Sequence, residues 1–205
     1  LKNPISVSSY RLSISVSLGI AKIQQTNNSF DILLGRADAA MYHVKNNKLD
    51  SFQEFDQSIS DNIYFKKRIS EFVKEAIIEG DFYLNYMPIY ETKSLEMIAF
   101  EVLIRASSNN MKGIGPDVFI PIAEEYNLIQ SLDLWVIENV FKKIKEDFYF
   151  LNTNPTVFCI NISSEELKNP FFSENLKQLL DKYEVPPKWI KLELTETSLV
   201  KTDQT

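Results

Sequence analysis

The sequence contains one cysteine, Cys159, one histidine, His43, and no long apolar run. A single cysteine excludes an internal disulfide, and its place in an apolar segment predicts a small buried side chain in a reducing compartment. Because no apolar stretch is long enough to cross a bilayer and no signal peptide is present, we expect these residues to make no direct membrane contact. We therefore expect a cytoplasmic location, or the cytoplasmic part of a membrane-tethered sensor.

Positive charge is also in short supply. The 205 residues carry 22 lysines and arginines against 28 aspartates and glutamates, which gives a net charge of -6. Such a surface repels polyanions, so the composition argues against nucleic acid or an anionic membrane as the main partner. The hydrophobic content of 44% is enough to bury one sizeable core or two modest ones. The chain is therefore expected to be globular.

Side-chain periodicity divides the chain into two parts. In the first part it predicts a strand, a helix and a second strand, over residues 11–19, 30–45 and 51–55. A linker helix from about residue 62 is expected to end near Gly80, because glycine suits a left-handed helix cap. We place the boundary after residue 57, which gives two domains, over residues 1–57 and 58–205.

The second part alternates between strand and helix patterns. Apolar runs with a period of two predict four strands, over residues 83–90, 97–105, 157–162 and 189–194. Three helices are predicted between them, over residues 118–127, 132–145 and 165–183. Pro186 and Pro187 are expected to stop the last helix before its strand. This alternation is typical of a β/α barrel or a doubly wound sheet, so the predicted fold class is α/β.

Three of the predicted strands place an oxygen-bearing side chain on one face. With a side-chain period of two, Glu101 shares a face with Leu103 and Arg105. Asn161 and Glu193 occupy matching positions in the next two strands. Strands between helices are normally apolar on both faces, so these matched polar positions predict a shared site.

Five segments of the second part carry recognisable motifs. They are Tyr-Met-Pro-Ile, Glu-Val-Leu-Ile-Arg, Phe-Ile-Pro-Ile-Ala-Glu-Glu, Asn-Ile-Ser and Glu-Leu-Thr-Glu, at residues 86–89, 101–105, 119–125, 161–163 and 193–196. In this order they resemble the motifs of EAL domains, which are bacterial phosphodiesterases that open cyclic di-GMP. The signature Glu-Ala-Leu-Leu-Arg of that family is similar to the second segment.

Two upstream segments resemble a different family. Residues 15–21 and 37–42, the latter followed by Lys45, are similar to the closing strand and helix of GGDEF domains, the diguanylate cyclase modules. The signature turn of that family is absent and no arginine follows Lys45, so we expect a degenerate part. The resemblance implies the C-terminal strand-helix-strand end of an α+β GGDEF domain over residues 1–57. It also implies the N-terminal half of a (β/α)8-type EAL barrel over residues 58–205.

The resemblance to EAL domains assigns roles to four residues. It implies that Glu101, Asn161 and Glu193 bind metal and that Glu196 anchors a loop over the metal ions, and these four form the expected catalytic set. Hydrolysis of a phosphodiester calls for divalent ions that activate water and stabilise the leaving oxygen. Carboxylate and amide oxygens suit Mg²⁺ or Mn²⁺, whereas zinc favours histidine and cysteine. The expected cofactor is therefore Mg²⁺ or Mn²⁺.

The same resemblance implies cyclic di-GMP as the ligand, contacted by Met87, Pro88, Leu103 and Arg105. The planar guanidinium of Arg105 has the geometry to fork onto two phosphate oxygens. Met87 stands where the family has a glutamine, and a thioether cannot replace an amide as hydrogen-bond donor or acceptor. We therefore expect a looser or altered substrate site.

Three functions remain open. The parent protein is expected to hydrolyse cyclic di-GMP to linear pGpG by two-metal catalysis, whereas residues 1–205 alone are expected to be inactive because the family's second-half ligands have no counterpart here. The alternative is a degenerate EAL domain that binds the dinucleotide, or docks a protein, without turnover. The third is a purely structural module, with Glu101 in an ion pair and Asn161 as a turn cap. Because half a barrel has unpaired strand edges, we also expect a homodimer.

Overall fold

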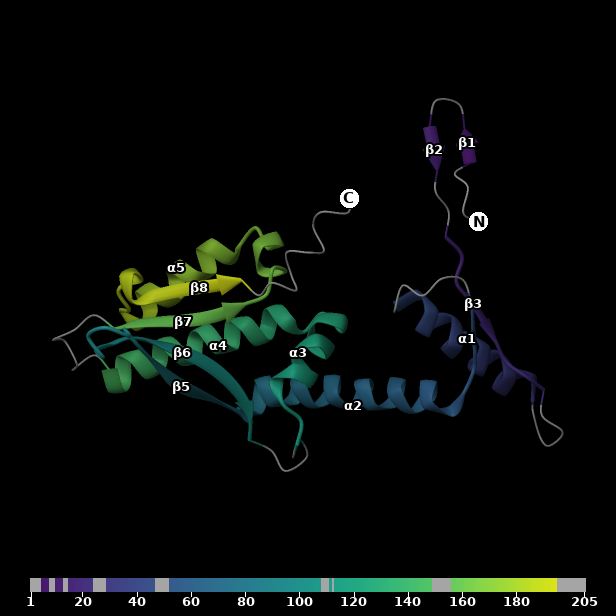
Figure 1. Ribbon diagram of the computed structural model, residues 1–205, viewed down its shortest axis with the longest axis horizontal. Helices are drawn as coiled ribbons and strands as arrows, with labels where there is room; N and C mark the ends of the chain where they lie inside the picture. Colours follow the sequence, from purple (N-terminus) through teal and green to yellow (C-terminus); the bar gives the residue numbers. More distant parts are fainter. Residues whose placement is uncertain are drawn as a thin grey trace. The chain divides into compact units, whose positions relative to one another are not determined.

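The computed structural model describes residues 5–7, 10–12, 15–23, 29–46, 52–107, 111, 113–148 and 156–194 (Figure 1). Contacts within the chain separate two compact units, residues 1–68 and 69–205. The division falls inside helix α2, which runs from Gln57 to Glu79. Each unit has its own strands and its own buried side chains.

The first unit contains two strand pairs. Strand β1 (Ile5–Val7) pairs antiparallel with β2 (Tyr10–Leu12), and β3 (Leu18–Ile20) pairs in parallel with β4 (Phe52–Glu54). The prediction of one strand over residues 11–19 is therefore wrong. Its two ends pair with different partners, so the chain leaves one sheet before it enters the other.

Helix α1 (Phe30–Asn46) approaches β3 at very close range. A β-carbon on Gly19, the middle residue of β3, would overlap the carbonyl oxygen of Ala37 and the backbone nitrogen of Met41. A residue with any side chain would push the helix away, so this approach requires glycine. The predicted helix over residues 30–45 is confirmed to within one residue.

Helix α2 begins at Gln57, earlier than the expected start near residue 62. The carboxylate of Asp56 accepts hydrogen bonds from the hydroxyl and the backbone N–H (2.8 Å) of Ser58, and these bonds lower the pKa of Asp56 below its usual value. Aspartate in this place caps a helix N-terminus. At the other end, Gly80 has a φ of 82°, which confirms the predicted left-handed cap.

The second unit is built on a four-stranded sheet in the order β5-β6-β7-β8. The strands are β5 (Phe82–Tyr90), β6 (Met97–Ala106), β7 (Val157–Ile162) and β8 (Ile190–Leu194). Strands β5 and β6 are antiparallel, and the other two pairs are parallel. All four predicted strands are confirmed to within one residue at each end. The fold is mixed α/β, and the four described strands form an open sheet.

Besides the C-terminal half of α2, three α-helices accompany this sheet in the described ranges. They are α3 (Pro116–Glu125), α4 (Ile129–Lys143) and α5 (Phe172–Tyr183). A π-helical turn extends α4 over Ile144–Phe148, and two 3₁₀ turns lie at Glu166–Lys168 and Pro187–Trp189. No helix in the described ranges is long and apolar enough to span a bilayer.

Helix α5 begins later than the helix predicted over residues 165–183, whereas its C-terminal end at Tyr183 is as predicted. Asn169 has extended backbone, because the following Pro170 disfavours the helical conformation, and the helix begins only after this break. At its C-terminus, Glu184 adopts the left-handed conformation with a φ of 58°. The helix therefore ends where predicted, with Glu184 as its cap, and Pro186 and Pro187 follow this cap before β8.

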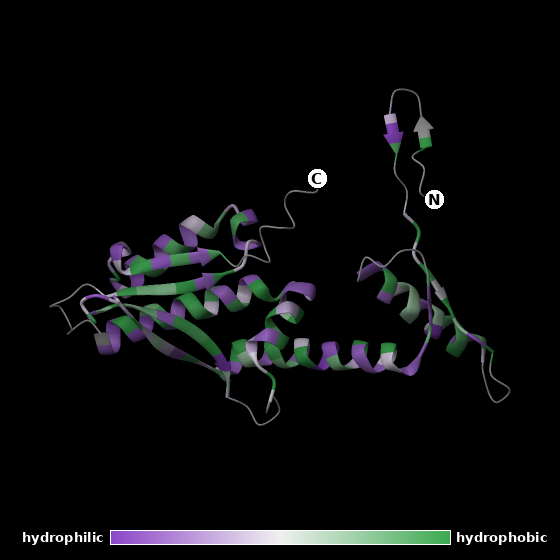
Figure 2. Ribbon diagram, in the orientation of Figure 1, coloured by the Kyte–Doolittle hydropathy of each residue, from purple (hydrophilic) through white to green (hydrophobic). Residues whose placement is uncertain are grey.

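The hydrophobic core of the second unit lies between the helices and one face of the sheet. Val102 of β6 and Ile160 of β7 point into it, and Phe119 of α3 and Ile137 of α4 meet them from the helices. Each such buried side chain contributes roughly 1.5–3 kcal/mol to folding. Figure 1 shows α4 alongside β6 and β7, and Figure 2 shows these two strands as mostly hydrophobic. Strand alternation turns the remaining side chains of β6 and β7 to the other face.

Candidate functional site

The sheet face that points away from the helices carries a row of side chains across all four strands. Pairing between neighbouring strands aligns Met87 with Glu101, Glu101 with Cys159, and Cys159 with Lys191. Aligned residues stand on the same face of a sheet. The row therefore places a thioether on one side of Glu101 and a thiol on the other, with the ammonium group of Lys191 one strand further on.

Asn161 and Glu101 come into contact on this face, from neighbouring strands. The Asn161 Nδ2 donates a hydrogen bond of 3.4 Å to the Glu101 Oε1, and both side chains are partly buried. Asn161 is also aligned with Glu193 on the far side, in β8. The structure thus brings the first two candidates together and places the third on the adjoining strand.

The carboxylate of Glu193 is held by a lysine from its own strand. The Lys191 Nζ lies 2.7 Å from the Glu193 Oε1, and the hydrogen bond raises the pKa of Lys191. The two side chains are 61% and 34% exposed, so solvent screens the pair and it adds little to stability. Lys191 was not among the sequence candidates, although its spacing of two from Glu193 places it on the same face.

Cys159 lies between the two glutamates and is buried, with an exposed fraction of 4%, as the sequence predicted. Burial raises the pKa of its thiol, and the nearby charge of Glu193 adds to this effect. The side chain therefore stays a neutral thiol at pH 7. It fills space beside Glu101 without adding charge.

The predicted substrate residues do not all lie on this face. Met87 is aligned with Glu101 and is 49% exposed, whereas Pro88 is aligned with Phe100. Consecutive strand residues point to opposite faces, so the structure places Met87 on the Glu101 side and Pro88 on the helix side. The Arg105 Nη1 donates a hydrogen bond of 2.8 Å to the carbonyl oxygen of Ile104. Glu196 lies outside the described residues.

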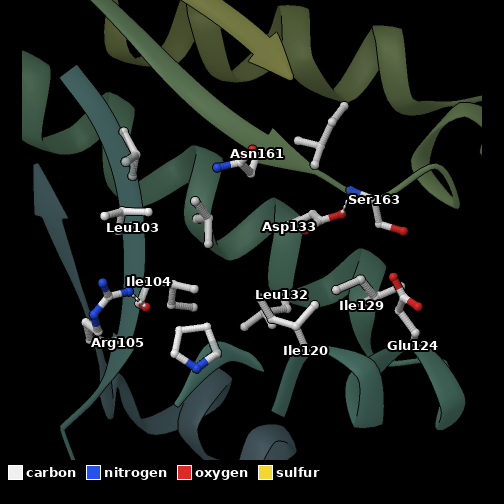
Figure 3. A pocket seen from close by; sticks show the side chains of 14 residues that line it. Leu103, Ile104, Arg105, Ile120, Glu124, Ile129, Leu132, Asp133, Asn161 and Ser163 are labelled. Atoms are coloured by element: carbon white, nitrogen blue, oxygen red, sulfur yellow. Dashed lines mark hydrogen bonds between the residues drawn. The ribbon is translucent and has the colours of Figure 1, made fainter. Parts of the chain in front are cut away.

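A cavity of about 110 Å³ opens where β6 and β7 end (Figure 3). Leu103 and Arg105 reach it from β6, and Asn161 reaches it from β7. Helices α3 and α4 form the opposite wall with mostly apolar side chains, including Ile120 and Leu132. Three residues expected to contact metal or substrate therefore line one cavity.

Asp133 of α4 also lines this cavity, and sequence reasoning missed it. Its side chain is only 6% exposed, and its Oδ2 accepts a hydrogen bond of 2.9 Å from the backbone N–H of Ser163. Burial raises the pKa of Asp133 to about 7, although the bond from Ser163 opposes this effect, and the charges of Glu166 and Glu124 add to it. A signal was present in its spacing, because Asp133 stands three residues before Val136 and four before Ile137, on the apolar stripe of the helix.

Glu101, Asn161 and Glu193 together offer oxygen donors to a divalent ion. Within the described part of the chain, no three histidine, cysteine, aspartate or glutamate side chains form a metal cluster. The set has two carboxylates and an amide, so its donors are all oxygens, as Mg²⁺ and Mn²⁺ prefer. Asn161 turns its Nδ2 toward Glu101, and rotation of the amide would present the Oδ1 instead. These residue types fit a hard divalent ion.

The family profile of the EAL domain matches residues 71–205 of this chain. The chain belongs to the EAL domain family. The match begins inside α2 and includes the whole sheet β5 to β8. The EAL signature segment itself, Glu101-Val-Leu103, lies in β6 at the face described above.

Two curated relatives match nearly the whole length of this EAL chain. The biofilm architecture maintenance protein MbaA of Vibrio cholerae serotype O1 is 30% identical over 184 residues, which cover 90% of this chain and 23% of MbaA. The bifunctional diguanylate cyclase/cyclic di-GMP phosphodiesterase MucR of Pseudomonas aeruginosa is 24% identical over 203 residues, which cover 98% of this chain and 29% of MucR. The chain thus spans about a quarter of the length of these relatives.

A solved structure shares the EAL fold. The EAL enzyme Bd1971, in its cAMP and cyclic-di-GMP bound form, matches with a TM-score of 0.61 at 23% identity. The match covers 87% of this chain and 46% of that one.

Proposed function

We propose that this chain is part of a cyclic di-GMP signalling protein whose EAL domain hydrolyses cyclic di-GMP to linear pGpG. The contact between Glu101 and Asn161 carries the proposal, because it brings two oxygen-bearing side chains together on the open face of the sheet. Membership of the EAL family supports it, as does the name of MucR, a cyclic di-GMP phosphodiesterase.

In this proposal Glu101, Asn161 and Glu193 hold Mg²⁺ or Mn²⁺, and Glu196 anchors a loop above them. A bound pair of such ions would supply an activated water and charge neutralisation at the phosphate. Arg105 lines the cavity beside Asn161, where its guanidinium would orient a phosphate of the ligand. Leu103 and Met87 would contact the nucleotide from β6 and β5.

We further propose that residues 1–57 are the C-terminal, degenerate end of a GGDEF domain and that residues 58–205 are the first half of the EAL barrel. The name of MucR, a diguanylate cyclase as well as a phosphodiesterase, supports this tandem order. So does the helix α1 packed on strand β3 over a glycine, in the first of the two compact units.

A non-catalytic cyclic di-GMP receptor is the second candidate, and two observations favour it. Met87, beside Glu101, offers no amide to a ligand. Lys191 holds the Glu193 carboxylate with an ammonium group, which competes with any metal ion for that oxygen. In a receptor, the same cavity and Arg105 would bind the dinucleotide without hydrolysis.

Metal titration tests the proposed ligands directly. Titration of the 205-residue chain with Mn²⁺ by calorimetry should show binding that Glu101→Gln weakens at least about tenfold, because a charge in contact with the ion is lost. The matched control is Glu174→Gln, an exposed acid on α5, which should bind like wild type. Equal affinities for wild type and Glu101→Gln would contradict the proposal.

Ligand titration separates the two candidate functions. The chain is mixed with cyclic di-GMP and Mn²⁺, binding is measured by calorimetry, and pGpG is sought by chromatography. The same assays are run on the longer parent protein. Hydrolysis by the parent protein supports the phosphodiesterase, and binding without hydrolysis supports the receptor. The absence of both binding and hydrolysis supports a purely structural module.

We also propose a homodimer. Among the described strands, β5 and β8 form the two edges of the sheet and each pairs on one side only. Exposed strand edges favour pairing with a second copy. Light scattering of the purified chain should give a dimer mass, and a monomer mass at working concentration would contradict this.

A further inference from the structure

We infer that Asp133 is a positioning residue for Asn161, acting through the turn that follows β7. The inference rests on the proposed function, because it concerns how one proposed metal ligand is held. Asp133 itself belongs to α4 and lines the same cavity as Asn161, from the helix side.

The turn after β7 is fixed by a small network around Ser163. The backbone N–H of Ser163 donates to the Asp133 Oδ2 at 2.9 Å (Figure 3). The hydroxyl of Ser163 accepts from the N–H of Glu165 at 3.1 Å, and its carbonyl oxygen accepts from the N–H of Glu166 at 3.2 Å. Ser163 and Glu166 are 5% and 3% exposed. Asp133 therefore ties this turn to helix α4 beside its strand end, and Gln130 of the same helix adds a second tie by donating its Nε2 to the carbonyl oxygen of Glu165 at 3.0 Å.

Asn161 needs such support because of its place in the strand. Strand β7 ends at Ile162, so Asn161 is its last residue but one. Strand ends open more easily than strand centres. On its own face, the Asn161 side chain has a single long hydrogen bond, to Glu101. An anchor two residues further on therefore controls where the amide lies.

The chemistry of the anchor also indicates a role beyond stability. A neutral amide at position 133 could accept the same hydrogen bond without the cost of a buried charge. A carboxylate holds a backbone N–H more strongly than a neutral acceptor does. The chain thus keeps a costly group where a cheaper one would close the turn, which suits a site that has to be held in one geometry.

The test compares Mn²⁺ affinity, measured by calorimetry on the full 205-residue chain, across four variants. Asp133→Ala removes the acceptor, and Asp133→Leu does so while keeping the volume filled, in case the first variant does not fold. Asp133→Asn keeps an acceptor. Val140→Ala, a fully buried core residue on the same helix, is the control for lost stability alone. Hydrogen exchange of the amides of residues 161–163 is measured in parallel.

We expect about a tenfold loss of Mn²⁺ affinity in Asp133→Ala or Asp133→Leu, as is usual for groups that orient metal ligands. Asp133→Asn should recover most of it, Val140→Ala should stay at the wild-type value, and exchange at residues 161–163 should speed up only when the acceptor is lost. Wild-type Mn²⁺ affinity in both acceptor-free variants overturns the inference, while loss in Glu101→Gln would still uphold the proposed function. Absence of Mn²⁺ binding in wild type overturns both.

Discussion

The carboxyl group of Asp133 lies buried between α4 and the end of β7, where its charged form is poorly solvated. Its pKa is raised from 3.8 to about 7, chiefly by burial. Between these two values the folded chain binds a proton that the unfolded chain does not. The protonated carboxyl of Asp133 therefore favours the folded chain at low pH, and this contribution to stability is lost as the pH rises toward 7.

A first prediction follows at the residue scale. Asp133→Asn removes the buried charge, so at pH 8 it should raise the free energy of unfolding by up to about 4 kcal/mol, whereas near pH 4 the difference should vanish. Urea unfolding of both proteins at several pH values, without metal, measures this. The facing carboxylates of Glu124 and Glu166 add to the raised pKa, and their repulsion with Asp133 is also removed in the variant. A difference that does not depend on pH would contradict the prediction.

At the scale of elements, close packing between a strand and a helix sets the tightest constraint in the first unit. Gly19 of β3 has no room for a β-carbon, because the backbone of α1 lies against it. Gly35, in the middle of α1, has open space around it and is exposed. The two glycines therefore have opposite requirements.

A second prediction uses this pair. Gly19→Ala should destabilise the packing of α1 on β3 by about 2 kcal/mol or more, because backbone atoms have to move. Gly35→Ala, the matched control, should stabilise the helix by about 0.5–1 kcal/mol. Hydrogen exchange of the α1 amides reports both changes. Equal exchange rates in the two variants would show that the close approach is not required.

The ends of helices α2 and α5 show which residues set the length of a helix. Asp56 starts α2 and Gly80 ends it, while Pro170 delays α5 and Glu184 closes it with a positive φ. The glycine cap could be predicted because glycine prefers this conformation. The glutamate cap could not, since a non-glycine residue takes a positive φ only when tertiary packing over-determines it.

At the scale of the whole molecule, the second unit has a core of its own. Every side chain in that core lies at or after Ile69, in the C-terminal half of α2 or beyond. The unit therefore contains the interactions that stabilise it, which is the usual property of a domain.

A third prediction is that residues 57–205 fold alone. The shortened chain keeps all of α2 and should unfold with a midpoint within about 2 °C of the corresponding transition in residues 1–205, because no core contact is lost. Scanning calorimetry of both chains checks this, with the fluorescence of Trp135 and Trp189 as a second probe of the same unit. A loss of cooperativity in the shortened chain would contradict the prediction.

Much of the second unit could be predicted because its pattern is local. Alternation located four strands to within a residue, and the same alternation placed Glu101, Asn161 and Glu193 on one face. The first unit was harder. Its serine-rich segment alternates as a strand should, yet its two ends pair with different partners, which periodicity cannot reveal.

The amino-acid order alone determined the strands of the second unit, the faces of their side chains and the motifs of the EAL family, because these depend on neighbours within a few residues. Only the tertiary structure decided that Asn161 contacts Glu101, that Lys191 holds Glu193, and that Asp133 ties down the turn after β7. Such contacts join residues from different strands and helices or depend on side-chain conformation. They exist only once the sheet and its helices have packed together.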